Sequence, residues 1–214
     1  MQKYISEFIG TFILLVSIVG SGIAGQQYTN DQMVILVSHA VVIGLTLIFI
    51  IGIFANFSGA HFNPIVSILF FLQKELSKKD LFLFISIQIT AAILGTIFAN
   101  YIFGLSIVEI SSNIRSGTNI YISEVFASFG LLMVILLSKV GGKNIVAFNV
   151  GIYITAAIIF TSSASFANPA VSIARIFTES FAGINPSTVI FFIGSQVIGM
   201  FGAYFLYNRL FKTK

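Results

Sequence analysis

Two short stretches decide the fold: GAHFNPIVSI at residues 59–68 and SFANPAVSIA at residues 165–174. Each centres on an Asn-Pro pair that lies deep inside an apolar segment. Pro at the first position of a helix loses no hydrogen bond, and Asn just before it is a good N-cap. A single Asn-Pro pair is a common turn signal, but two copies in the pattern N-P-[IA]-V-S-I are far more specific. Each stretch is therefore predicted to begin a helix within an apolar region.

The composition places these helices in a membrane. Of the 214 residues, 57% are hydrophobic and 8% are charged, whereas about a quarter of a soluble domain is charged. The first apolar run extends from Phe8 to Asn30 without a convincing cleavage site, so a retained helix is expected. There is no cysteine, which excludes disulfides and thiolate metal sites. The net charge of +4 gives no sufficient reason to expect nucleic-acid binding.

Hydropathy predicts an all-α integral membrane protein. A span needs roughly 20 apolar residues. We expect six transmembrane helices near residues 4–25, 33–55, 80–104, 120–139, 145–162 and 187–209. The apolar segments at 63–72 and 168–178 are too short to cross and are predicted to be two re-entrant half-helices.

The basic residues fit this topology. Nine of them fall on one side of the six-helix arrangement: Lys3, Lys74, Lys78, Lys79, Lys139, Lys143, Arg209, Lys212 and Lys214. Only Arg115 and Arg175 fall on the other side. By the positive-inside rule both termini are expected to be cytoplasmic, in a multi-pass protein of the inner or plasma membrane.

The two halves of the chain contain similar sequence motifs in the same order. SEFIGTFILLV (6–16) matches SEVFASFGLLMV (123–134), and IQITAAILG (87–95) matches SQVIGMFGA (195–203). A single channel domain over 1–214 is expected, with one repeat at about 1–108 and the other at about 118–214. Because each repeat has three spans, the second enters the membrane inverted. Inverted repeats place a substrate path near the bilayer midplane.

Paired half-helices suit a passive pore. Half-helices meeting tip to tip aim their positive dipole ends at the membrane centre, which repels cations and protons. The amides of Asn63 and Asn168 can donate to a passing neutral acceptor. No group needs to change its protonation.

Two carboxylates lie in apolar helices. A charge there costs roughly 2.5–3.5 kcal/mol. Glu124 is expected to accept hydrogen bonds from a re-entrant loop, and structural support is the expectation for Glu7 as well, although Glu7 could simply sit at the interface. A proton relay would need an intramembrane partner, and the spans offer no Asp, Lys or second carboxylate.

At these residues the chain resembles an aquaporin, a member of the major intrinsic protein family. The resemblance runs through EFIGTF (7–12), SGAHFNPIVSI (58–68), NPAVSIAR (168–175) and SQVIGMFGA (195–203). It implies a six-helix pore with two half-helices, one pore per subunit and assembly as a homotetramer in the lipid bilayer. It also implies that Asn63 and Asn168 orient the permeant, within the motifs Asn63-Pro64-Ile65 and Asn168-Pro169-Ala170.

The chain departs from the family pattern at two places. Ile65 stands where Ala is usual, which puts a bulkier side chain at the meeting point of the half-helices. The outer filter, an aromatic, His and Arg ring in water-selective members, is predicted by counting along the motifs to be Ile43, Ala156, Ser165 and Val171. Val171 stands where the resemblance implies Arg. Such a ring is wider and more apolar, so it should pass small neutral solutes larger than water.

Two further residues, Arg175 and His61, are candidates near the ends of the pore. Arg175 follows Val171 by four residues and lies on the same helix face one turn further out, so it is either a displaced filter or the partner of Glu179, or both. His61 is expected to line the inner pore, with packing as the alternative. His39 is expected to be a satisfied interhelical residue.

Passive conduction of glycerol, urea or metalloid hydroxides, together with water, is therefore the predicted function. A strict water channel, a coupled secondary transporter and a structural membrane protein with a closed pore stay open as alternatives. Neither histidine has a metal-ligand partner at a suitable spacing, so no metal or cofactor is expected. No phosphate-binding loop or catalytic triad occurs, so the chain is not expected to be an enzyme.

Overall fold

The computed structural model describes residues 1–211 and is all-helical over that range. Six long helices within this range are apolar enough to cross a membrane. They are α1 (Gln2–Tyr28), α2 (Gln32–Phe54), α4 (Lys78–Ile102), α5 (Thr118–Ser138, extended by η1, Lys139–Gly141), α6 (Lys143–Phe160) and α8 (Pro186–Leu210). The predicted all-α membrane fold is confirmed, and each predicted span lies within a few residues of its helix.

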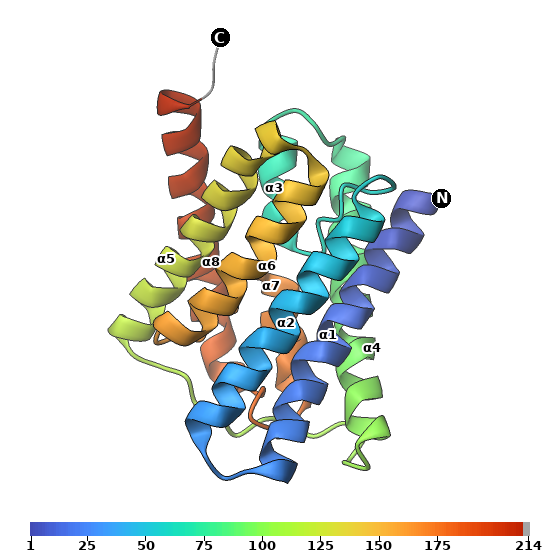
Figure 1. Ribbon diagram of the computed structural model, residues 1–214, viewed down its shortest axis with the longest axis vertical. Coiled ribbons are helices and arrows are strands. Elements are labelled where there is room, and N and C mark those ends of the chain that lie inside the picture. Colours follow the sequence, from blue (N-terminus) through green and yellow to red (C-terminus); the bar gives the residue numbers. More distant parts are fainter. Residues whose placement is uncertain (212–214) are drawn as a thin grey trace.

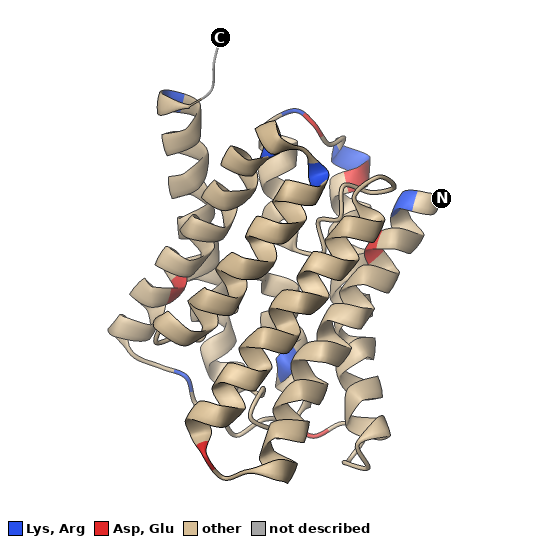
Figure 2. Cartoon of the chain, viewed as in Figure 1, with Lys and Arg blue, Asp and Glu red and all other residues tan. Residues whose placement is uncertain are grey.

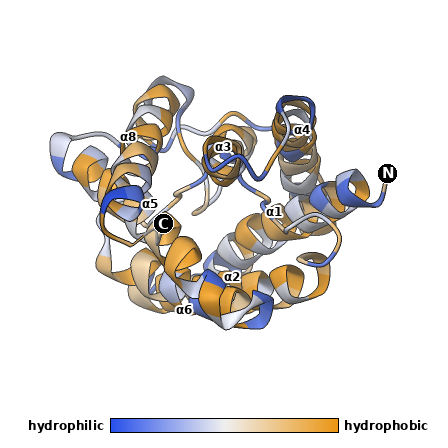
Figure 3. Cartoon of the chain, turned by 90° about the horizontal axis from the view of Figure 1, so that it is seen from above, coloured by the Kyte–Doolittle hydropathy of each residue, from blue (hydrophilic) through white to orange (hydrophobic). Residues whose placement is uncertain are grey.

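Two short helices lie inside the bundle. They are α3 (Pro64–Leu72) and α7 (Pro169–Ala174), and α7 continues into the 3-10 turn η2 (Arg175–Phe177). In Figure 1, α3 lies in the half of the bundle that carries the termini and α7 lies in the other half. Seen from above, α3 lies between α4 and α8 (Figure 3), and it contacts both. Neither short helix is long enough to span a bilayer, so the two together take the place of one membrane-spanning helix.

The helices begin where the sequence provides caps. The Asp31 carboxylate accepts from the backbone N–H groups of Met33 (2.8 Å) and Val34 (3.2 Å) and starts α2. Asn185 caps α8 in the same way, with Pro186 at the first helical position.

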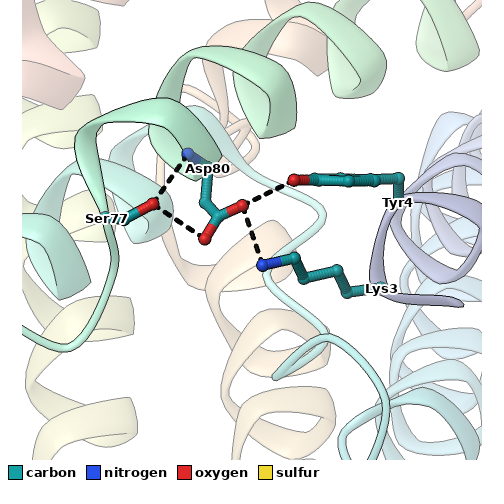
Figure 4. Close-up of polar contacts among 4 residues, drawn as sticks. All are labelled: Lys3, Tyr4, Ser77 and Asp80. Carbon is teal, nitrogen blue, oxygen red and sulfur yellow. Dashed lines mark hydrogen bonds and ion pairs between the residues drawn. The ribbon is translucent and has the colours of Figure 1, made fainter. Parts of the chain in front are cut away.

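The start of α4 is tied to the start of α1 (Figure 4). Ser77 Oγ accepts from the backbone N–H of Asp80 (3.1 Å) and donates to its carboxylate (2.8 Å). The other carboxylate oxygen of Asp80 accepts from Tyr4 Oη at 2.7 Å and pairs with Lys3 Nζ at 2.8 Å. This cluster fixes the N-terminal ends of two neighbouring spans at the same level.

Lys and Arg collect at the end of the bundle where both termini lie (Figure 2). They belong to the start of α1, the α3–α4 and α5–α6 connections and the end of α8, which are the positions expected from the sequence. Lys212 and Lys214 lie outside the described residues.

Glycine permits close helix contact at Gly95. A Cβ there would meet the Phe12 carbonyl oxygen of α1 at 2.6 Å, whereas at Gly202 it would meet only a Phe129 ring carbon at 3.3 Å. Small residues let membrane helices approach closely. We expect Gly95→Ala to lower the melting temperature in detergent, because overpacking costs about 1–3 kcal/mol. Gly202→Ala is the matched control and should melt near the native protein. Equal melting temperatures for the two variants would contradict the close-packing role of Gly95.

Candidate functional site

The tips of α3 and α7 meet through their asparagines. Asn63 Oδ1 accepts from the backbone N–H of Ile65 (3.1 Å), and Asn168 Oδ1 accepts from that of Ala170 (3.0 Å), so each side chain caps its own helix. The amide nitrogens cross to the opposite repeat. Asn63 Nδ2 donates to the Ala167 carbonyl oxygen (2.7 Å), and Asn168 Nδ2 donates to that of Phe62 (2.9 Å). An amide group has two hydrogens, so each asparagine keeps one donor for the space between the tips.

The loops that lead into the half-helices are held in an unusual conformation. Five non-glycine residues of these loops adopt a left-handed backbone with φ of 44–55°: Ala60, Phe62, Ala164, Ser165 and Ala167. Ala60 and Phe62 match Ser165 and Ala167 at the spacing of 105 residues that separates Asn63 from Asn168. Such a conformation costs energy in a non-glycine residue and persists only where its surroundings hold it.

Two buried carboxylates stabilise this conformation of the loops. Glu7 accepts from the backbone N–H groups of His61 (2.9 Å) and Phe62 (2.8 Å) and from Ser58 Oγ (2.7 Å). Glu124 accepts from the backbone N–H groups of Phe166 and Ala167.

A glutamine and a serine complete each of these networks. Gln88 Nε2 donates to Glu7 (2.8 Å) and to Ser67 Oγ (3.0 Å). In the second repeat Gln196 Nε2 donates to Glu124 (2.8 Å) and to Ser172 Oγ (2.9 Å). The two loops are therefore fixed by equivalent sets of residues, one from each repeat.

A cavity of about 490 Å³ runs past both asparagines. At the end that carries the termini, Lys139, Lys143 and Glu75 line it, and at the other end His39 and Arg175 line it. Between these ends the wall is mostly aliphatic, and among the described residues Glu75 is the one carboxylate of the lining. The arrangement suits an uncharged molecule that moves past a few fixed hydrogen-bond donors.

Three of the four predicted filter residues line this cavity: Ile43, Ser165 and Val171. The fourth prediction, Ala156, does not agree with the structure, because Ala156 is exposed on the outer surface of α6. The residues of α6 that line the cavity include Ile154 and Ile158. Each is two residues from Ala156, which is a rotation of about 200° around a helix. The wall is therefore aliphatic at this position as well.

Ile65 lies away from the cavity. Its side chain is fully buried, as is that of Ala170, and neither residue is part of the lining. The larger residue in the first Asn-Pro motif therefore alters the packing behind the half-helices and leaves the lumen unobstructed.

Arg175 lies in the lining and is almost completely buried. Its Nε donates to the Ala182 carbonyl oxygen, and its guanidinium carbon is 3.5 Å from the centroid of the Phe166 ring. The alternative that Arg175 pairs with Glu179 is wrong. The Glu179 carboxylate instead accepts from Ser112 Oγ (2.6 Å) and from the Ser112 backbone N–H, and these bonds hold the pKa of Glu179 below its usual value.

His61 lines the inner part of the cavity and contacts Ser67 Oγ through Nδ1 (3.1 Å). Nearer the mouth, Lys139 Nζ pairs with Glu75 Oε1 (2.6 Å) and Lys143 Nζ donates to Asn56 Oδ1 (3.0 Å). The inner mouth is therefore polar, with its charged groups in contact with neighbours.

Several lining residues were not predicted from the sequence, although the internal repeat relates some of them to one another. The missed residues include Leu14, Ile18, His39, Val66, Leu131, Ile135, Ile154 and Ile158. Leu14 and Leu131 are 117 residues apart, as are Ile18 and Ile135, and this is also the spacing of the two carboxylates. Val66 and Val171 share the spacing of the asparagines. Pairing every apolar residue at these offsets finds part of the lining.

Comparison with known proteins agrees with this geometry. The profile of the family described as "Major intrinsic protein" matches residues 1–165. The chain is 38% identical to "Aquaglyceroporin AqpS" of Rhizobium meliloti (strain 1021), over 92% of this chain and 85% of that one. It is 28% identical to "Probable aquaporin TIP-type" of Medicago truncatula, over 80% of this chain and 73% of that one.

A solved structure has the same fold. The aquaglyceroporin from Plasmodium falciparum superposes with a TM-score of 0.73 at 21% identity, over 98% of this chain and 96% of that one. The chain therefore belongs to the major intrinsic protein family and is a passive membrane channel, not an enzyme.

Proposed function

We propose that the channel conducts small uncharged solutes of the glycerol, urea or metalloid-hydroxide type, together with water. The observation that carries this proposal is the aliphatic lining at Ile43, Ile158 and Val171, which we call the apolar ring, with Val171 in the place where the water-selective pattern has Arg. A ring without a fixed charge or a large polar group admits solutes with a carbon skeleton. The name of the bacterial relative, an aquaglyceroporin, supports the same substrate class.

The two asparagines set the orientation of the permeant. Each has one amide hydrogen that is not used by the opposite repeat, and both residues line the cavity. A neutral solute or a water molecule accepts these bonds in turn as it passes. The N-terminal ends of α3 and α7 add positive potential at the same point, which opposes protons and cations.

We also propose an assembly and an orientation, which the family pattern and the charge distribution support. We place both termini on the cytoplasmic side, because the basic residues gather there. Repeats 1–108 and 118–214 form one channel domain, and four copies assemble with one pore in each. Glu7 and Glu124 act as structural supports of the re-entrant loops.

Reconstitution tests the substrate class. Liposomes that contain the purified channel should shrink in a hyperosmotic gradient of glycerol, urea or arsenous acid and then re-swell as the solute enters. Liposomes without protein should re-swell much more slowly. Water flow without re-swelling in all three solutes would contradict the proposal and support a strict water channel. Flux that depends on an ion gradient would instead support a coupled transporter.

A further inference from the structure

We propose that His39 and Arg175, each one helical turn outside the apolar ring of Ile43, Ile158 and Val171, form a polar ring together with Ser165, and that this ring binds the hydroxyl groups of neutral polyols during passage. This inference rests on the proposed function and specifies how the solute is recognised. All three residues of the polar ring line the cavity.

Arg175 supplies hydrogen-bond donors that no other described residue accepts from. It is 4% exposed. Within residues 1–211 no carboxylate pairs with it, and the one hydrogen bond of its side chain runs from Nε to the Ala182 carbonyl oxygen. A guanidinium has five N–H donors, and a buried charge is normally paired or fully hydrogen-bonded. Its terminal nitrogens therefore lack protein acceptors at the edge of the lumen, where a permeating oxygen can accept from them.

Ser165 and His39 add two further polar atoms. Ser165 Oγ is buried and has no hydrogen-bond partner among the described residues. His39 bonds Ser21 Oγ through Nδ1 (2.8 Å), which leaves Nε2 without a partner over the same part of the chain. Neutral His Nε2 either donates or accepts, and a hydroxyl does both. His39 is thus both the interhelical residue that was expected and a wall of the lumen.

One short segment holds this ring together. The His39 ring lies edge-on to Phe181 with centroids 5.6 Å apart, and Arg175 donates to the next residue, Ala182. Ser165 directly precedes Phe166, whose ring lies against the Arg175 guanidinium. His39 of α2 and Arg175 of η2 therefore meet at residues 181–182, and Arg175 also contacts Phe166 of the second re-entrant loop.

The polar ring lies outside the apolar ring. His39 precedes Ile43 by four residues on α2, which runs inward from the end opposite the termini. Arg175 follows Val171 by four residues on the half-helix that runs outward. Four residues advance a helix by about 6 Å. A polyol can therefore place its hydroxyl oxygens against the polar ring while its carbon atoms enter the apolar ring.

Arg115 provides a matched control. It lies beside the same Phe166 ring, with its guanidinium carbon 5.4 Å from the ring centroid, and it is not part of the cavity lining. It also holds the same segment, donating to the carbonyl oxygens of Gly183 (3.1 Å) and Phe181 (2.8 Å). Lys in place of either arginine keeps the charge and removes the planar set of donors. If Arg175, like Arg115, only holds this segment in place, the two Arg→Lys variants should behave alike.

The decisive measurement is the ratio of glycerol to water permeability in proteoliposomes. In Arg175→Lys we expect this ratio to fall about tenfold, the effect of losing one hydrogen bond to a charged donor. His39→Phe, which keeps an aromatic ring against Phe181, should also lower the ratio. Arg115→Lys should leave it at the native value.

Two results would overturn the polar ring: an unchanged ratio in Arg175→Lys, or an equal fall in both Arg→Lys variants. If Arg175→Lys does not fold, as judged by size-exclusion chromatography, His39→Phe decides, and an unchanged ratio there rejects the ring. Flux through the native channel distinguishes failure of the polar ring from failure of the proposed solute channel. Glycerol flux in the native channel with insensitive variants rejects only the ring, whereas absent native flux of glycerol, urea and arsenous acid rejects the solute channel and the ring with it.

Discussion

A channel with Arg in place of Val171 should lose most of its glycerol and urea permeability while it still passes water. Val171 lines the cavity and is 3% exposed, so a longer side chain at this position extends into the lumen. Arg would narrow the apolar ring and add fixed donors that water can satisfy more readily than a solute with a carbon skeleton. We expect glycerol permeability to fall about a hundredfold, which corresponds to a barrier increase of about 3 kcal/mol. Stopped-flow light scattering of proteoliposomes measures both permeabilities.

Val171→Met separates the effect of width from that of charge. Met has a similar reach but no donors and no charge, so it should reduce glycerol and water permeability together. If the glycerol to water ratio of Val171→Arg equals that of the native channel, position 171 is not part of the filter.

Glu124→Ala should abolish conduction because the second re-entrant loop loses its support. The change removes the acceptor for the backbone N–H groups of Phe166 and Ala167 and for the Gln196 side chain. A buried donor without an acceptor costs about 1–3 kcal/mol, so three of them cost roughly 3–5 kcal/mol even after partial relaxation. Ala167 would then be free to leave its left-handed conformation, and the acceptor of Asn63 would move with it.

Fluorescence-detected size-exclusion after heating measures the loss of stability, and proteoliposome flux measures the loss of conduction. Glu109→Ala is the control, since Glu109 is an exposed carboxylate in the loop between α4 and α5. It should match the native protein in both assays. Normal thermal stability and flux in Glu124→Ala would show that the loop does not depend on this carboxylate.

The spans and the half-helices could be predicted because hydropathy and caps act locally. A run of apolar residues predicts a spanning helix without knowledge of its neighbours, and Asn63-Pro64 and Asn168-Pro169 determine their helix starts on their own. The support by Glu7 and Glu124 was also predictable, because an isolated carboxylate in an apolar helix needs donors and the loops have them.

The rotation of α6 could not be obtained by counting along the motifs. Hydropathy is high on all sides of a membrane helix, so it does not show which face meets the lumen and which meets lipid. An error of two residues therefore moves the choice from Ile154 or Ile158 to Ala156, on the opposite face. The periodicity of Val146, Val150, Ile154 and Ile158 at intervals of four residues becomes meaningful only once the cavity is known.

The polar ring depends on contacts between residues far apart in the sequence. Nothing near His39 indicates that its ring meets Phe181, and nothing near Arg175 indicates that Glu179 turns away to Ser112. Both outcomes depend on how the loop before α8 folds back over the bundle.

The crossed bonds between the two asparagines have a consequence for biogenesis. When α3 first enters the bilayer during translation, the acceptor of the Asn63 amide lies 104 residues further along the chain and has not yet been inserted. The Asn63 amide therefore lacks its acceptor, the Ala167 carbonyl oxygen, until the second re-entrant loop has been synthesised and inserted. Closure of the two tips is then a late event in maturation, and a nascent chain released just before α7 contains five of its six spans but no finished pore.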